Sequence, residues 1–191
     1  LALSVPTFSY GQTAPVVVEL FSSQGCASCP PADEFLLELA QQRNIIALGW
    51  PVDYWDYIGW KDAFAHPAFT ERQKAYARAL KQRMVYTPQF IINGAESPKA
   101  GRRAEIAALI QKYAQRAPEA DLSIRRVGAS YNVILQNAQS TGGYDVQLVS
   151  VSPLETVEIS RGENAGRRLE YANSVIGWQN LGRWDGLGPT T

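Results

Sequence analysis

Two cysteines, Cys26 and Cys29, lie between a strand-like and a helix-like segment of the chain. The β-branched run at 16–21 has the length of a strand, and Pro30 and Pro31 suit a first helical turn, where a missing N–H costs nothing. A C-x-x-C pair between a strand and a helix is typical of a redox site. This pair therefore constrains the fold and the chemistry of the chain more than any other feature.

The placement of the pair predicts different roles for its two thiols. A thiolate at a helix N-terminus is stabilised by the helix dipole and by free backbone N–H groups, which lower its pKa. We expect Cys26, nearest the open end, to be the more exposed, more acidic and attacking thiol. Cys29, further into the helix, would be buried and would resolve a mixed disulfide.

Other interpretations of the cysteines stay open at this point. A zinc site needs about four ligands, whereas the sequence offers two cysteines and a single histidine, His66. A Cys26–His66 dyad for acyl transfer has the right residue types, but nothing brings the two together. A fixed structural disulfide in an exported protein is the remaining alternative. We expect no metal and no organic cofactor.

The remainder of the N-terminal half alternates between strand and helix patterns. Apolar runs at 45–52 and 86–92 predict strands, and the stripe at 106–113 predicts a helix. A T-x-x-Q capping box predicts that another helix begins at Thr70, with Met84 on its apolar side. The first two strands should run parallel through the intervening helix. The expected fold class is α/β.

The pattern changes after Pro118. Period-two alternation predicts four short antiparallel strands, at 122–124, 133–135, 144–148 and 157–159. We therefore expect an α/β domain at 15–117 and a β-rich C-terminal subdomain at 118–191 that packs on it, because so small a β segment is marginal alone.

The first residues and the overall charge bear on location and partners. Residues 1–14 are uncharged and rich in small side chains, which predicts a leader remnant or a disordered N-terminus and a periplasmic or secreted protein. The 18 basic and 18 acidic residues cancel, which excludes nucleic-acid binding by a strong cationic excess. No apolar run reaches the roughly 18 residues of a membrane span, so an integral membrane protein is not expected.

Aromatic residues concentrate in the long loop expected after the second strand. They form either a substrate wall beside the cysteines or a satellite core: Trp50, Tyr54, Trp55 and Trp60. Because the loop and Cys26 both follow strand ends at one edge of the sheet, we expect the loop to border the disulfide. The aspartates of this stretch lack the spacing of a calcium loop and should face solvent: Asp53, Asp56 and Asp62.

Two further carboxylates lie near the pair in sequence. Glu19, in the first strand, could relay a proton to the buried thiol, or it could be a paired carboxylate. Asp33, in the first helical turn, is expected to complement the helix dipole.

Several long motifs resemble the DUF1223 family of thioredoxin-like, mostly exported bacterial proteins. They are Val18–Asp33, Val52–Asp62, Val85–Gln89, Arg161–Arg167 and Leu181–Trp184. The resemblance covers nearly everything after Pro15. One position departs from it, because Pro51 stands where the family commonly has a histidine before Val-Asp-Tyr-Trp.

The resemblance implies a thioredoxin-like fold in which Pro88 is cis and, with Thr87, lines the groove where a substrate backbone docks. It implies a thiol–disulfide oxidoreductase in which Cys26 attacks and Cys29 resolves. Its partners would be protein or small thiol and disulfide substrates. The alternative is a non-catalytic binding module on the same scaffold, with a structural Cys26–Cys29 disulfide.

Overall fold

The computed structural model describes residues 14–140 and 142–190, so the expected leader remnant lies, apart from Ala14, outside the described residues. The chain forms a mixed α/β fold whose elements run in the order β1 (Val16–Ser22), α1 (Pro30–Ala40), β2 (Ile45–Pro51), the 3-10 helix η1 (Asp56–Ile58), α2 (Pro67–Ala79), β3 (Gln89–Ile92), α3 (Arg103–Ala114), β4 (Asp121–Val127), β5 (Ser130–Gln136), β6 (Tyr144–Glu158) and β7 (Arg168–Trp184). A five-stranded mixed sheet has the order β3-β1-β2-β7-β6, and β4 and β5 form a separate two-stranded sheet.

Strand β1 lies inside the larger sheet and is buried on both faces. It pairs in parallel with β2, as predicted, and antiparallel with β3. Its alternate residues Val16, Val18 and Leu20 pack with Phe35 of α1 and Ile106 of α3 in one core. Burial on both faces explains why β1, apart from Glu19, is apolar from Val16 to Phe21 and shows no alternation.

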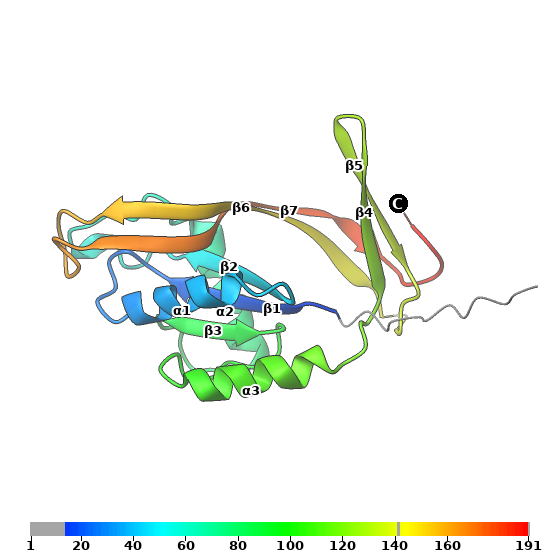
Figure 1. Cartoon of the computed structure of the whole chain (residues 1–191), viewed down its shortest axis with the longest axis horizontal. Helices are drawn as coiled ribbons and strands as arrows, with labels where there is room; N and C mark the ends of the chain where they lie inside the picture. Colours follow the sequence, from blue (N-terminus) through cyan, green and yellow to red (C-terminus); the bar gives the residue numbers. More distant parts are fainter. Residues whose placement is uncertain (1–13, 141, 191) are drawn as a thin grey trace, which may run out of the picture.

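The opposite face of the sheet carries a second, aromatic core. Phe21, Trp50 and Ile91 from three neighbouring strands meet Phe69 of α2 and Val175 of β7. Helix α2 therefore covers one face of the sheet, while α1 and α3 cover the other (Figure 1).

The C-terminal half extends the same sheet. Strand β7 meets β2 in parallel at Gly49 and Ser174, and then runs antiparallel to β6 along most of its length. The 144–148 and 157–159 segments are the two ends of the single strand β6, and β7 was not expected from the period-two pattern. A side chain at Gly49 would approach the carbonyl oxygen of Ala172 to 3.2 Å, so a glycine permits this close junction.

The second helix begins earlier than its capping box predicts. Its first residue is Pro67, and the extended residue His66 is the N-cap, with its ring Nδ1 accepting the Ala68 N–H at 3.1 Å. Proline at the first helical position explains the shift, because its fixed φ suits that position. The helix ends at Ala79, so the prediction that Met84 lies on its apolar side was wrong. The Met84 side chain is exposed.

Hairpin β4–β5 stands apart from the helices, across one end of the long β6–β7 ribbon (Figure 1). Within the described ranges, no helix combines the length and apolar character needed to cross a bilayer.

Candidate functional site

The cysteine pair occupies the turn between β1 and α1. Cys26 and Cys29 form a disulfide, with their Cα atoms 5.4 Å apart. The Cys29 N–H donates to the Cys26 carbonyl at 3.2 Å, and the Cys29 carbonyl accepts the first helical N–H groups, from Ala32 and Asp33. Cys29 is therefore the N-cap of α1 and not a residue inside it, which corrects the expectation from sequence.

Both cysteines are buried. Cys26 is 1% exposed and Cys29 is 0% exposed, although Ala27 and Ser28 between them face solvent. These two values do not distinguish the thiols, so the expectation that Cys26 is the more exposed of the two stays a prediction. The predicted difference in acidity between the two thiols stays a prediction, since both are oxidised in this structure.

Three side chains hold the residues that lead into the pair. The buried Asn164 amide donates from Nδ2 to the carbonyls of Gln24 and Cys26, at 2.9 and 3.0 Å. The Trp60 indole N–H donates to Gln24 Oε1 at 2.8 Å, and Asp62 Oδ2 accepts the Gln24 N–H at 2.9 Å. The loop before the cysteines is thus fixed by two segments that lie far away in sequence.

The aromatic loop borders this turn, as predicted. A Cβ placed on Gly25 would lie 3.3 Å from Cβ of Trp55, so the two residues are in contact immediately before Cys26. The indole N–H of Trp55 also donates to Thr87 Oγ1 at 2.7 Å. The Thr87–Pro88 bond is cis, which confirms that prediction. Trp55 therefore joins the cysteine turn to the segment that enters β3.

The remaining aromatics divide between core and loop. Trp50 is fully buried and packs edge-on against Phe69 and Trp178, so the core alternative holds for this residue and the substrate wall does not. Tyr54 is half-buried and donates its hydroxyl to Gln73 Oε1 at 3.1 Å. Burial raises the pKa of Tyr54 to about 12, so the phenol stays protonated at neutral pH.

Glu19 is a paired carboxylate on the aromatic face of the sheet. Its oxygens accept from Arg72 Nε at 2.7 Å and Arg72 Nη2 at 3.0 Å, and it also accepts the Tyr76 hydroxyl. The Arg72 guanidinium lies over the rings of Trp50, Tyr76 and Trp178, where cation–π attraction supports it. These contacts give Glu19 a role in docking α2, so they lend no support to a proton relay.

A small cavity of about 20 Å³ lies beside the disulfide turn. Its lining includes the buried Asp33 and Asp62, together with Ser22 and Tyr171. In the described part of the chain, Asp33 Oδ2, Ser22 Oγ and the Tyr171 hydroxyl have no hydrogen-bond partner within the protein. The volume suffices for one water molecule, which can satisfy such groups.

Burial shifts the protonation of this cluster. Burial raises the pKa of Asp33 well above its ordinary value; the nearby Ser22 hydroxyl opposes that rise without good hydrogen-bond geometry, and the Asp62 and Glu34 carboxyls add to it. Burial likewise raises the pKa of Asp62, against the opposing hydrogen bonds from the Gln24 and Phe64 N–H groups. The expectation that Asp62 faces solvent was wrong.

Asp33 is joined to the cysteine pair through helix α1. It follows Cys29 by four residues, and its N–H donates to the Cys29 carbonyl at 3.1 Å. Side chains four residues apart share one helix face, with Cβ atoms about 5–6 Å apart. The helix therefore provides a buried, protonatable carboxyl one turn beyond Cys29.

The geometry does not support a zinc site or a Cys26–His66 dyad, the two alternatives that would need His66. The His66 ring caps α2 and packs near Phe69. Within residues 14–140 and 142–190, no three His, Cys, Asp or Glu side chains are grouped so that they could hold a metal ion.

These observations define a class of protein: a mixed α/β fold with a C-x-x-C disulfide, buried carboxyls beside it and an aromatic loop around it. The chain belongs to the family described as protein of unknown function (DUF1223), whose model matches residues 17–191. No curated protein matches the sequence.

Two solved structures share this architecture. Protein AGR_C_4864 from Agrobacterium tumefaciens, known from an X-ray crystal structure, is 36% identical, with a TM-score of 0.81 over 94% of this chain and 78% of its own. HBP35 of Porphyromonas gingivalis is 14% identical, with a TM-score of 0.62 over 92% of this chain and 59% of its own, a likeness that concerns the fold alone.

Proposed function

We propose that the protein is a thiol–disulfide oxidoreductase built on a thioredoxin-like α/β unit. The observation that carries the proposal is the Cys26–Cys29 disulfide between the end of β1 and the N-cap of α1, with a buried carboxyl one helical turn further. The Thr87–Pro88 segment, which enters the strand next to β1, is proposed to line the substrate groove.

The exchange moves an electron pair between sulfur atoms, and the thiolate that leaves takes up a proton. An external thiolate attacks Cys26 Sγ and forms a mixed disulfide; the bond to Cys29 breaks, and Cys29 leaves as a thiolate. Protonated Asp33 can supply the proton that Cys29 takes up, because burial favours its neutral form. In the reverse direction, the Asp33 carboxylate accepts that proton and the Cys29 thiolate attacks the mixed disulfide.

Because Cys26 is buried, the proposal must include a route by which a substrate reaches its sulfur. Trp55 lies against Gly25, and Asn164 holds the Cys26 carbonyl, so a substrate must displace the aromatic loop before it reaches the sulfur. Trp55, Tyr54 and Trp60 would then select substrates at the entrance. The substrates would be protein or small thiols and disulfides in the periplasm or outside the cell, where disulfides persist.

Glutathione disulfide provides a direct assay of the roles of the two thiols. The reduced wild-type protein should become oxidised, whereas Cys29→Ser should stop as a glutathione adduct on Cys26, detected by mass spectrometry. The matched variant Cys26→Ser should form its adduct more slowly, because the helix N-terminus is expected to lower the pKa of Cys26 more than that of Cys29. Equal or faster adduct formation on Cys29 would overturn the assignment.

A structural disulfide is a second candidate, favoured by the burial of both sulfurs. The closed loop is very short, however, and chain-entropy estimates give such a crosslink only about 2 kcal/mol. A Cys26→Ala/Cys29→Ala variant should therefore stay folded and lose roughly 4–8 °C in Tm by calorimetry. Loss of cooperative unfolding would favour the structural candidate instead.

A further inference from the structure

The β4–β5 hairpin has little to hold it in place. All seven residues of β4 are exposed, including Leu122 at 59% and Ile124 at 63%. A two-stranded sheet is marginally stable by itself in water, and it usually gains stability from a further strand or a packing partner. The exposed apolar side chains of β4 therefore indicate a surface that is completed by another molecule.

The two edges of the hairpin differ. On the outer side of β5, Leu135 exchanges two backbone hydrogen bonds of 3.0 Å with Thr190. For β4, the described residues provide pairing with β5 alone. The hairpin turns through two residues after Val127, so alternation places the N–H and C=O groups of Leu122 and Ile124 on the open edge.

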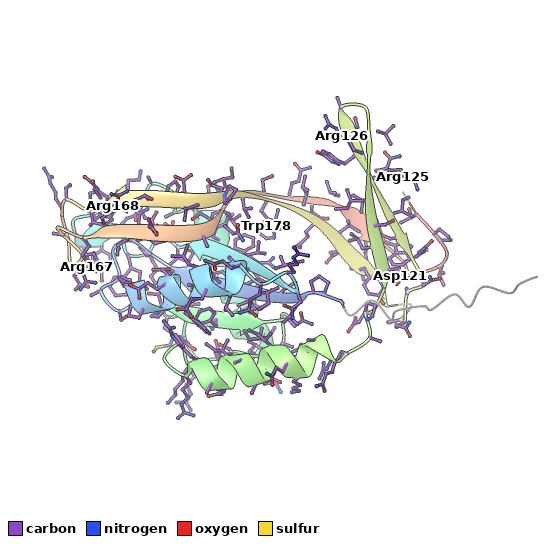
Figure 2. All side chains as sticks on the ribbon, in the orientation of Figure 1. Asp121, Arg125, Arg126, Arg167, Arg168 and Trp178 are labelled. Atoms are coloured by element: carbon purple, nitrogen blue, oxygen red, sulfur yellow. A yellow bond between two sulfur atoms is a disulfide. The ribbon has the colours of Figure 1, made fainter. Side chains whose placement is uncertain are left out.

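The charges of β4 select one register for a copy of itself. Asp121 and Arg125 lie on one face of the strand, on either side of Ser123, and Figure 2 shows Asp121 near the base of the hairpin and Arg125 nearer its tip. A twofold axis through Ser123 sets Asp121 opposite Arg125 twice, and Leu122 opposite Ile124 twice. Opposite charges and apolar pairs facing each other across strands are both stabilising.

Neighbouring registers lose this match. Moving the axis to Ile124 would set Leu122 opposite Arg126 and Asp121 opposite Val127. Moving it to Arg125 would set that guanidinium against its own copy, which is destabilising. Asp121 Oδ2 already accepts from Asn137 Nδ2 at 2.7 Å, which fixes the carboxylate and leaves Oδ1 for a partner.

We propose that the protein forms a homodimer in which β4 pairs antiparallel with β4 of a second copy around a twofold axis through Ser123. The two hairpins then form one four-stranded sheet, and the open edge of each β4 is removed. Because one pair of strands is a small contact, the dimer dissociates reversibly and its population rises with protein concentration.

Charge reversal tests the register by sedimentation velocity over a range of concentrations. Asp121→Arg and Arg125→Asp should each raise the dimer dissociation constant about tenfold, because two attractive pairs become repulsive. The double variant should recover most of the loss. Arg126→Asp is the matched control and should have little effect, because in this register residue 126 lies opposite Ala120. A monomer at every concentration, or no recovery in the double variant, would overturn the proposal.

Disulfide crosslinking gives a second, independent measurement. In the proposed dimer the two Ser123 side chains face each other in a non-hydrogen-bonded pair, with Cβ atoms about 4.5–5.5 Å apart. Ser123→Cys should therefore form a covalent dimer under mild oxidation, whereas the control Ser130→Cys, which is also exposed, should not. Equal crosslinking of the two variants would mean random collision and would contradict the pairing.

Discussion

At the scale of single residues, Asp33 has the environment least expected of its type. It lies in the first turn of α1, where a carboxylate usually faces solvent and complements the dipole, but here it is buried against Tyr171 and Asp62. Asp33 also lines a second cavity, together with Glu34 of the same helix and Arg168 and Glu170 of β7. A buried carboxyl without a cationic hydrogen-bond partner is held there at the expense of stability.

Replacing Asp33 with asparagine should stabilise the protein at neutral pH. Because its pKa is raised on folding, the folded state binds the proton more tightly, and stability falls as pH rises from about 4 through the raised pKa. Asp33→Asn should therefore unfold at a higher urea concentration than the wild type at pH 7, because the variant has no buried carboxyl to ionise.

Urea unfolding at several pH values would measure this gain. The difference between Asp33→Asn and the wild type should shrink toward zero below about pH 3, where the carboxyl is protonated in both the folded and the unfolded state. The exposed neighbour Glu34→Gln is the control and should change little. A variant destabilised at pH 7 would show that Asp33 is ionised and paired.

The sequence predicted some residues of the cysteine turn but not the distant residues that contact it. Cys26 and Cys29 were identified from their local spacing, and Pro88 from the family resemblance. Asn164 and Asp62 were missed as contacts of this turn, because they reach Gln24 across 140 and 38 positions of sequence. The one available signal for Asn164 was its place inside a long family motif.

At the scale of secondary-structure elements, a largely buried ion pair helps to hold helix α2 on the sheet. Arg72 donates twice to Glu19 of β1, and both side chains lie among aromatic rings. Removing one partner of a buried pair leaves an uncompensated charge, which is far more costly than losing a surface pair.

Arg72→Ala should destabilise the protein by about 3–5 kcal/mol in chemical denaturation. Lys74→Ala, which removes the exposed i,i+3 pair with Glu71 on the same helix, should cost less than about 1 kcal/mol. Combining Arg72→Met with Glu19→Leu should recover much of the stability, because no charge then remains buried. Similar losses for Arg72→Ala and Lys74→Ala would contradict this role.

The elements also show where periodicity fails. Apolar runs located β1, β2 and α3 to within a few residues, because each repeats its pattern over its whole length. Strand β7 was not predicted, because glycines and Asn173, with a φ of 45°, interrupt its alternation. Its pairing with β6 also shifts register twice. Such irregularities are bulges, which depend on the partner strand.

At the scale of the whole molecule, the C-terminal half completes the first half's core. Asn173 donates to the Ala47 carbonyl of β2 at 3.0 Å, and Val175 and Trp178 pack on Trp50 and its neighbours. Figure 2 marks Trp178 on the long β6–β7 ribbon, which lies along the sheet edge formed by β2. The sheet is therefore continuous across the boundary expected near residue 118.

A fragment of residues 15–117 should not fold cooperatively. It would expose the aromatic core around Trp50 and leave the β2 edge and the cysteine turn without Asn164. We expect weak near-UV circular dichroism and no sharp thermal transition for the fragment, whereas the full chain gives both. A cooperative transition in the fragment would show that the two halves are independent domains.

The reduction potential of the Cys26–Cys29 pair tests the redox proposal most directly. Equilibration in glutathione or dithiothreitol buffers, followed by thiol alkylation and mass spectrometry, gives the ratio of reduced to oxidised protein. We predict reversible reduction of a protein that stays folded, at a potential above about −300 mV. A potential below that value, or unfolding on reduction, would show that the disulfide is a structural crosslink and would contradict the oxidoreductase proposal.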